Sequence, residues 1–130
     1  MKDETRQWLR YAEENRRTAH LARDDGLLNP CLQNCQQAVE KQLKAMTIEL
    51  GEPLHRTHSI RELTSLLRTR GVNTNLSDDD CDLLDSVYLP SKYPLGSALP
   101  YFDPDLAVCD RCLEIVDRLT EDVGRILGSP

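Results

Sequence analysis

The feature of the sequence that most constrains the fold is an apolar stripe within residues 29–51. Its members recur at intervals of three and four residues: Leu32, Cys35, Val39, Leu43, Met46 and Leu50. This spacing places them on one face of an α-helix, whereas the side chains of a β-strand alternate with a period of two. Asn29 followed by Pro30 predicts the start of this helix, and Gly51 with Pro53 predicts its end.

The same criteria predict four further helices. Ser59 and Glu62 have the spacing of a capping box, and Asp103 precedes Pro104 as a predicted N-cap. The four helices are expected at about residues 2–25, 59–71, 77–89 and 104–127. Short connections between long amphipathic helices favour an all-α, up-and-down antiparallel bundle of four to five helices, predicted as one domain over residues 1–130.

Composition and charge narrow the class of protein. Aromatic residues make up only 5% of the chain, so the core is expected to consist mainly of Leu, Val, Ile and Ala. No segment has the ~20 consecutive apolar residues of a membrane span, and a cytoplasmic protein is expected. The net charge of −6 argues against broad nucleic-acid binding. However, residues 1–71 hold 12 basic and 10 acidic side chains, whereas residues 72–130 hold 4 and 12.

The helix predicted over residues 29–51 also carries polar side chains. Gln37, Lys41 and Lys44 follow one another at helical spacing and project to one side, with Glu40 beside them. Amide and ammonium groups placed in this way are able to hold a phosphate or the edge of a base. The alternative, which composition alone favours, is a solvated face with Gln37–Lys41 and Glu40–Lys44 as neighbours.

Two other segments carry candidate ligand-binding residues. His58 directly precedes the helix predicted from Ser59, where it is placed to meet an anion at the N-terminal amides or to pack locally. His55 is expected to be exposed in the same loop. Lys92 and Tyr93 lie in a proline-containing loop, where they offer a phosphate contact and a stacking face. The alternative for Tyr93 is that it packs against the end of the bundle.

The five cysteines suggest packing more than chemistry. Cys31 and Cys35 are four residues apart, and Cys109 and Cys112 form a CxxC motif; two such pairs are one pattern of a zinc site. Both pairs fall within predicted helices and partly on apolar stripes, so small hydrophobic side chains are the favoured interpretation. The chain has no glycine-rich phosphate loop, nucleophile elbow or His-Glu metal helix, and no cofactor is expected.

Taken together, these segments resemble the HEPN domain family. The resemblance rests on residues 8–12, 36–45 (QQAVEKQLKA), 57–60 (THSI) and 92–94 (KYP), in the expected order over nearly the whole chain. It implies a bundle of four or five helices, usually dimeric, with a cleft for nucleotides or RNA. Many members are encoded beside a minimal nucleotidyltransferase, in pairs that resemble toxin–antitoxin systems. The predicted ligand-binding residues are Gln37, Glu40, Lys41, Lys44, His58, Lys92 and Tyr93.

The sequence departs from the family in one respect that bears on catalysis. Ribonuclease members carry an arginine and a histidine separated by four to six residues, and none of His20, His55 and His58 has an arginine at that upstream spacing. Arg16 and His20 come nearest, with three residues between them. No catalytic residue is therefore assigned. The leading hypothesis is a nucleotide-binding or partner-binding module, and the alternatives are a divergent ribonuclease toxin or a purely structural dimer.

Overall fold

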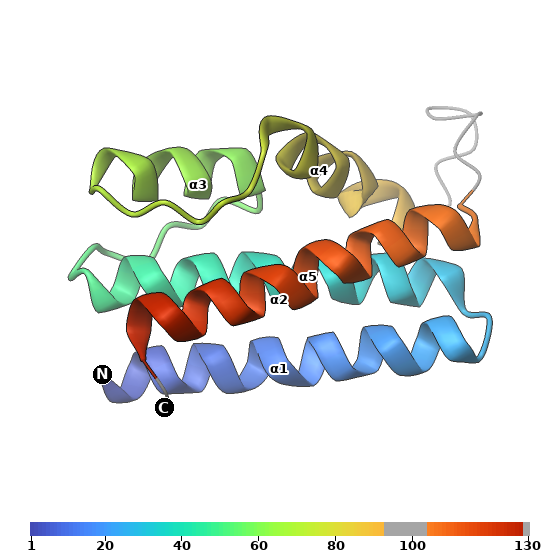
Figure 1. Cartoon of the computed structure of the whole chain (residues 1–130), viewed down its shortest axis with the longest axis horizontal. Helices are drawn as coiled ribbons and strands as arrows, with labels where there is room; N and C mark the ends of the chain where they lie inside the picture. The colour runs from blue at the N-terminus through green and yellow to red at the C-terminus, as the bar shows by residue number, and fades with distance from the viewer. Residues whose placement is uncertain (93–103, 129–130) are drawn as a thin grey trace.

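The computed structural model describes residues 1–92 and 104–128, which form five α-helices and no strand. These helices are α1 (Asp3–Asp24), α2 (Leu28–Glu49), α3 (Ile60–Thr69), α4 (Asp78–Lys92) and α5 (Leu106–Leu127). α1, α2 and α5 run along the long axis of the molecule, and α3 and α4 follow one another in a further layer (Figure 1). The predicted all-α bundle is confirmed. No helix in the described part of the chain is long and apolar enough to cross a membrane.

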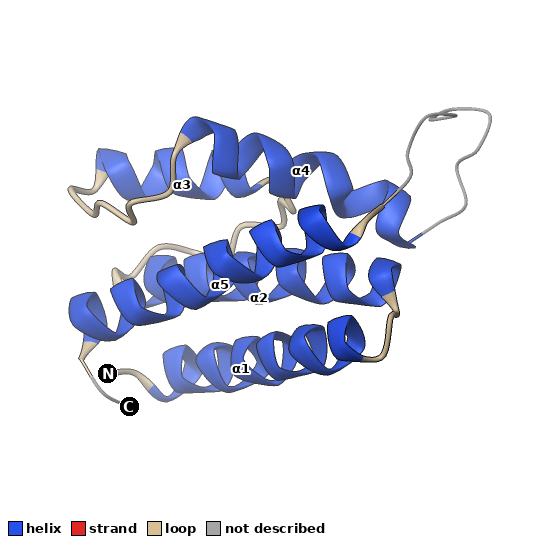
Figure 2. Cartoon of the chain, turned by 45° about the vertical axis from the view of Figure 1, so that its right-hand side comes forward, coloured by secondary structure: helices blue, strands red, loops and turns tan. Residues whose placement is uncertain are grey.

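α2 lies at the centre of the bundle and packs against all four other helices. The turned view of Figure 2 shows the same arrangement, with α2 enclosed between α1, α5 and the layer formed by α3 and α4. The predicted stripe is buried at Leu32, Cys35, Val39, Leu43 and Met46. Because neighbours surround α2, side chains away from this stripe are also removed from solvent. Its polar residues therefore occupy an environment that an isolated amphipathic helix does not provide.

The predicted start of α2 is wrong by two residues. The N-cap is Leu27, which offers no side-chain cap, and Asn29 already lies inside the helix. Gly26 adopts a positive φ of 75°, and the Leu27 amide donates to the Ala22 carbonyl at 2.8 Å. This tight turn leads the chain from α1 directly into α2, so the turn sets the start of the helix and the capping preference of Asn29 does not.

The other differences lie at the ends of α4 and α5. α4 continues past the predicted end at Leu89 and through Pro90 to Lys92. The Ser91 hydroxyl donates to the Tyr88 carbonyl at 3.3 Å in this last turn. The N-cap of α5 is Asp105, whose carboxylate accepts a hydrogen bond from the Val108 amide at 2.8 Å. The predicted cap Asp103 lies outside the described residues.

The start of α3 is held by two residues, of which the sequence predicted one. The Ser59 hydroxyl accepts from the Glu62 amide at 3.2 Å, which confirms the predicted capping interaction. In addition, the Asp85 carboxylate from α4 accepts from the amides of Ile60 at 2.6 Å and Arg61 at 3.2 Å. A carboxylate at this end of a helix satisfies free amides and complements the helix dipole. Asp85 thereby ties α4 to the loop that precedes α3.

Candidate functional site

A buried ion pair on α2 forms the centre of the candidate site. Glu40 and Lys44 are only 4% and 5% exposed, and Lys44 Nζ lies 2.9 Å from Glu40 Oε2. The solvated-face interpretation is wrong for these two residues, because the helices around α2 cover them. Removing two charges from water is unfavourable unless they pair and find further hydrogen-bond partners. Glu40 meets this condition through contacts with two other residues.

The first of these partners is His58, in the loop before α3. Its Nδ1 atom lies 3.1 Å from Glu40 Oε1, while its side chain is 52% exposed. An ionised carboxylate only accepts hydrogen bonds, so the contact places the ring proton on Nδ1 and leaves Nε2 as an acceptor in the neutral ring. The structure therefore holds His58 in one orientation from within the bundle and presents the ring at the surface.

The second partner is Gln36, which links α2 to the same loop. Its buried amide nitrogen donates to Glu40 Oε1 and to the backbone carbonyl of His58, both at 3.1 Å. The Gln37 side-chain amide then donates to Gln36 Oε1 at 2.7 Å. Residues of α2 and of its neighbouring loop thus share one hydrogen-bond network around Glu40. This network positions both the ring and the backbone of His58.

α4 supplies the other side of the site. The Tyr88 ring lies 4.8 Å from the His58 ring, centroid to centroid, and Lys92 Nζ lies 4.7 Å from the Tyr88 centroid. A pocket of about 310 Å³ opens beside these rings. Its lining consists of His58, Ser59, Asp85, Ser86, Tyr88, Leu89 and Pro90. An imidazole, hydroxyl groups and a nearby ammonium are the groups with which proteins hold phosphate esters.

The structure separates Lys41 from this cluster. Lys41 Nζ donates to Asn15 Oδ1 of α1 at 2.6 Å, and partial burial lowers the pKa of Lys41 below its ordinary value. No carboxylate within the described residues lies at ion-pair distance from it. His55, predicted to be exposed, is instead half-buried, and its Nε2 atom is shielded from solvent. Tyr93 lies outside the described residues.

Sequence reasoning missed the role of Tyr88 at this site. Tyr88 lies on the same face of α4 as Leu84 and Val87, and those two residues are buried. Tyr88 belongs to the same face but contacts both His58 and Lys92. The available signal was its position four residues before Lys92, which places the two side chains on the same face of a helix. The prediction that α4 ended at Leu89 concealed this relation.

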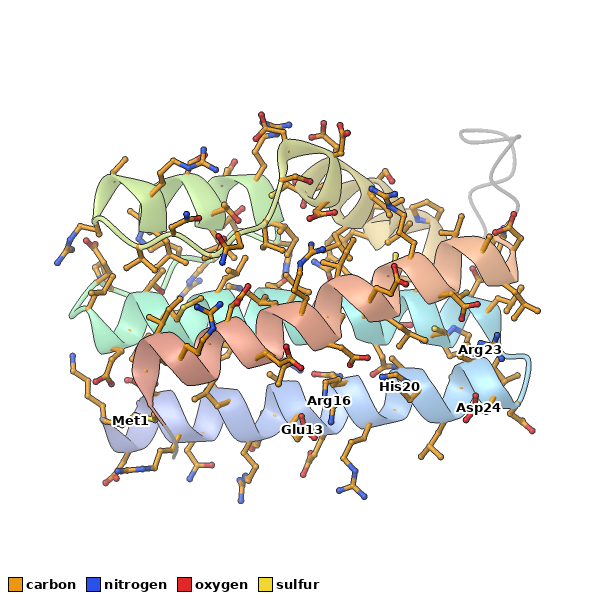
Figure 3. All side chains as sticks on the ribbon, viewed as in Figure 1. Met1, Glu13, Arg16, His20, Arg23 and Asp24 are labelled. Carbon is orange, nitrogen blue, oxygen red and sulfur yellow. The ribbon has the colours of Figure 1, made fainter. Side chains whose placement is uncertain are left out.

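A second polar cluster lies between α1 and α5. Asp117 of α5 accepts from Arg16 Nη1 at 3.0 Å and lies 3.0 Å from His20 Nε2. Arg16 also makes two hydrogen bonds to Glu13, each 2.8 Å long. In Figure 3 the side chains of Arg16 and His20 extend from α1 towards α5. Both residues therefore connect the first helix to the last.

Metal chemistry has no candidate centre in the described part of the chain. No group of three or more His, Cys, Asp or Glu side chains there is arranged to hold an ion. All five cysteines are free thiols and are buried. All five belong to the hydrophobic core cluster, and four of them, Cys31, Cys35, Cys109 and Cys112, lie on α2 and α5. Packing is the role that the structure gives them.

Comparison with solved structures identifies the architecture as a HEPN-type helical bundle. TT1696 from Thermus thermophilus matches with a TM-score of 0.76 and 22% identity, covering 95% of this chain and 98% of that chain. ST0689, an archaeal HEPN homologue, matches with a TM-score of 0.68 and 22% identity, covering 98% and 99%. The HEPN domain model matches residues 5–126, so the chain belongs to the HEPN domain family. A comparison with curated proteins gave no match.

Proposed function

We propose that this HEPN protein is a binding module for nucleotides, in which His58 and Lys92 hold the phosphate. The observation that carries this proposal is the contact between buried Glu40 and half-exposed His58 at 3.1 Å. A carboxylate that fixes a histidine from inside the fold reduces the ordering that a ligand must otherwise impose, and preorganisation of this kind favours binding. Lys92 adds a positive charge beside the same pocket.

Isothermal titration calorimetry of the intact chain with ATP and GTP tests nucleotide binding. Since a hydrogen bond to a charged group contributes about 1.5–3 kcal/mol, His58→Ala is expected to weaken binding about tenfold or more. His20→Ala provides a matched control. The His20 ring on α1 also lies beside a carboxylate, that of Asp117 on α5, but His20 does not line the pocket at His58. Absence of heat with every nucleotide, or equal loss in both variants, would contradict the proposal.

A protein partner is the second part of the proposal. Membership of the HEPN family supports a homodimer and a partnership with a minimal nucleotidyltransferase. Multi-angle light scattering of the purified chain is expected to give twice the monomer mass. Co-expression with the product of an adjacent nucleotidyltransferase gene is expected to give a complex that survives gel filtration. A monomer in the first experiment would exclude the homodimer, and separate elution in the second would exclude that partner.

One observation favours ribonuclease activity as a second candidate function. A histidine oriented by a carboxylate is the arrangement that general acid–base catalysis uses, and Glu40 and His58 have it. The candidate predicts that purified protein cleaves single-stranded RNA and that expression arrests growth. His58→Ala is expected to abolish cleavage, whereas His20→Ala is expected to retain it. RNA that stays intact in the presence of wild-type protein would exclude this function.

A further inference from the structure

The pocket at His58 contains polar groups that the proposed phosphate contacts do not use. Besides His58, its lining includes the Ser59 hydroxyl, the Asp85 carboxylate and the Ser86 hydroxyl. Each of these groups has a fixed number of hydrogen-bond donors and acceptors, some of which the protein already occupies. The donors and acceptors that stay free decide which part of a nucleotide fits beside them.

The Asp85 carboxylate has one acceptor position left. Its Oδ2 atom accepts from the Ser59 hydroxyl at 3.1 Å and from the Arg61 amide at 3.2 Å. Its Oδ1 atom accepts from one group among the described residues, the Ile60 amide at 2.6 Å. An ionised carboxylate offers about four such positions, two on each oxygen. Oδ1 is therefore able to accept one more hydrogen bond, and the side chain that carries it lines the pocket.

The two serines of the pocket differ in what they leave free. The Ser59 hydroxyl donates to Asp85 and accepts from the Glu62 amide at 3.2 Å, so the cap of α3 occupies it. The Ser86 hydroxyl donates to the Leu83 carbonyl at 2.6 Å, and within the described residues its oxygen accepts no hydrogen bond. Asp85 and Ser86 thus present acceptors to the pocket, and the ligand group that matches them is a hydrogen-bond donor.

Phosphate does not meet this requirement beside Asp85, whereas a sugar does. A phosphate group is negatively charged and offers acceptors, so the Asp85 carboxylate repels it and neither Asp85 nor Ser86 has a free donor for it. A sugar hydroxyl is uncharged and donates a hydrogen bond. In a ribonucleotide the sugar carries such hydroxyls at its 2′ and 3′ positions, and the 2′-hydroxyl distinguishes the ribose from deoxyribose.

The order of residues along α4 separates the carboxylate from the cationic groups of the same site. Asp85, Tyr88 and Lys92 follow one another at intervals of three and four residues, which places them on one face of the helix. Asp85 and Lys92 are therefore about 10 Å apart along the helix axis. The Tyr88 ring, one turn after Asp85, contacts both His58 and Lys92. A nucleotide along this face has room for its sugar at Asp85 and its phosphates at the cationic end.

We propose that Asp85 and Ser86 accept hydrogen bonds from the ribose hydroxyls of a nucleotide whose phosphates lie at His58 and Lys92. The pocket then selects ribonucleotides, because a ligand without these hydroxyls leaves the acceptors unpaired, and a site built to bind a hydroxyl rejects an analogue that lacks it. This inference rests on the proposed nucleotide-binding function, to which it adds the sugar that the site recognises.

Calorimetry of the intact chain with ATP and with 2′,3′-dideoxy-ATP tests this selection. The two ligands share the base and the triphosphate and differ only in the two hydroxyls. Because a hydrogen bond to a charged group is among the stronger ones, wild type is expected to bind dideoxy-ATP about tenfold more weakly than ATP. Equal affinity for both ligands would overturn the inference and leave nucleotide binding intact. If neither ligand binds, the proposed function and the inference fail together.

Variants assign the preference to the two residues. The preference for ATP over dideoxy-ATP is expected to fall below about threefold in Asp85→Ala and to fall by about threefold in Ser86→Ala. Comparing two ligands within one variant separates recognition of the sugar from a general loss of affinity. Asp82→Ala is the matched control, because Asp82 is an exposed residue one turn earlier on α4 that does not line the pocket. It is expected to keep the preference of wild type.

Circular dichroism verifies that the three variants keep their helical content. Ser86 takes no part in the cap of α3, so Ser86→Ala measures the preference even if Asp85→Ala loses its fold. An undiminished preference in either Asp85→Ala or Ser86→Ala would overturn the role of that residue, and an undiminished preference in both would overturn the inference. The same loss in Asp82→Ala would also overturn it, because the effect would then not depend on the lining of the pocket.

Discussion

Glu40 is the residue on which the candidate site depends most. Its two carboxylate oxygens meet the ammonium of Lys44, the amide of Gln36 and the imidazole of His58. Each partner comes from a different position in the chain, and together they compensate for the loss of solvent around a buried charge. The Glu40 side chain thus has two effects: it stabilises α2 and it orients the exposed His58 ring.

Paired substitutions measure how strongly Glu40 and Lys44 depend on each other. Lys44→Met leaves the Glu40 carboxylate buried without its cation, and the free energy of unfolding is expected to fall by about 3–5 kcal/mol. The double variant Glu40→Gln/Lys44→Met buries neither charge, so it is expected to lose clearly less stability than the two single variants combined. Urea unfolding followed by circular dichroism measures the free energy of unfolding of Lys44→Met, Glu40→Gln and the double variant. Strictly additive losses would show that the two groups do not interact.

The buried thiols give a second prediction for single residues. Burial raises the pKa of the Cys112 thiol to about 12, and burial also raises that of Cys109 to about 12. At pH 8 about one thiol in ten thousand is then ionised at each position, and only the thiolate reacts with iodoacetamide. Mass spectrometry is expected to find both residues unlabelled in the native protein and labelled in guanidinium chloride. Leu21→Cys, an exposed control, is expected to react within minutes, and equally fast labelling of Cys112 would contradict this account.

At the scale of elements, α3 and α4 depend on a contact across their connection. Asp85 of α4 caps the amides of Ile60 and Arg61, and it also accepts from the Ser59 hydroxyl at 3.1 Å. The loop that carries His58 enters α3 at this point. Asp85 therefore holds the start of α3 and also the side of the pocket that His58 and Ser59 form.

Removal of this cap is expected to destabilise the protein measurably. Asp85→Ala leaves two amides at the start of α3 without their acceptor, and a lost cap lowers stability by about 1–2 kcal/mol. Asp82→Ala is the matched control on α4, since Asp82 makes only an exposed pair with Arg61, and its loss is expected to be below about 1 kcal/mol. Urea midpoints compare the two variants. Equal, small losses would show that Ser59 caps α3 sufficiently by itself.

At the scale of the whole molecule, the cluster around Arg16 joins the two ends of the chain. Arg16 contacts Glu13 of α1 and Asp117 of α5. Arg23 of α1 contacts Asp110 of α5 in the same manner, at 2.8 Å. These pairs hold the first helix beside the last, with the hydrophobic core beneath them. Contacts between residues so far apart in sequence require most of the chain to be in place before they form.

The pH dependence of stability is expected to reflect this cluster. Hydrogen bonds from Arg16 lower the pKa of Glu13 below its ordinary value. The stabilisation is therefore complete above the pKa of Glu13 in the unfolded chain, about 4.3, and is lost as the pH falls through the lower pKa of the folded state. Glu13→Gln is expected to be less stable than wild type by up to about 1 kcal/mol at pH 7, with little difference at pH 3.

Urea unfolding at the two pH values measures this difference. Glu14→Gln serves as the control, because Glu14 lies next to Glu13 on α1 and makes no ion pair in the described part of the chain. Its stability relative to wild type is expected to change little between pH 7 and pH 3. A constant difference between Glu13→Gln and wild type at both pH values would contradict the linkage to the Glu13 carboxylate.

The sequence alone was sufficient to predict most of the helices and the core residues that α2 contributes. Periodicity placed Leu32, Val39 and Leu43 in the core, and the structure buries them completely. The cap at Ser59 was also predictable, because its partner Glu62 lies three residues away. Signals of this kind are local, since both members fall within one or two helical turns. The wrong helix start at Asn29 arose where a tight turn overrode such a local preference.

The site depended on information that no local pattern contains. Glu40 and Lys44 are visible in the sequence as neighbours on a helix, but only the packing of four helices around α2 decides that they are buried. The contacts of Glu40 with His58 and of Lys44 with Trp8 join residues from separate elements. Sequence thus determined the residue types and the helices that carry them. Tertiary structure decided which charged side chains are buried and which rings lie beside them, because burial depends on neighbours that are distant in the chain.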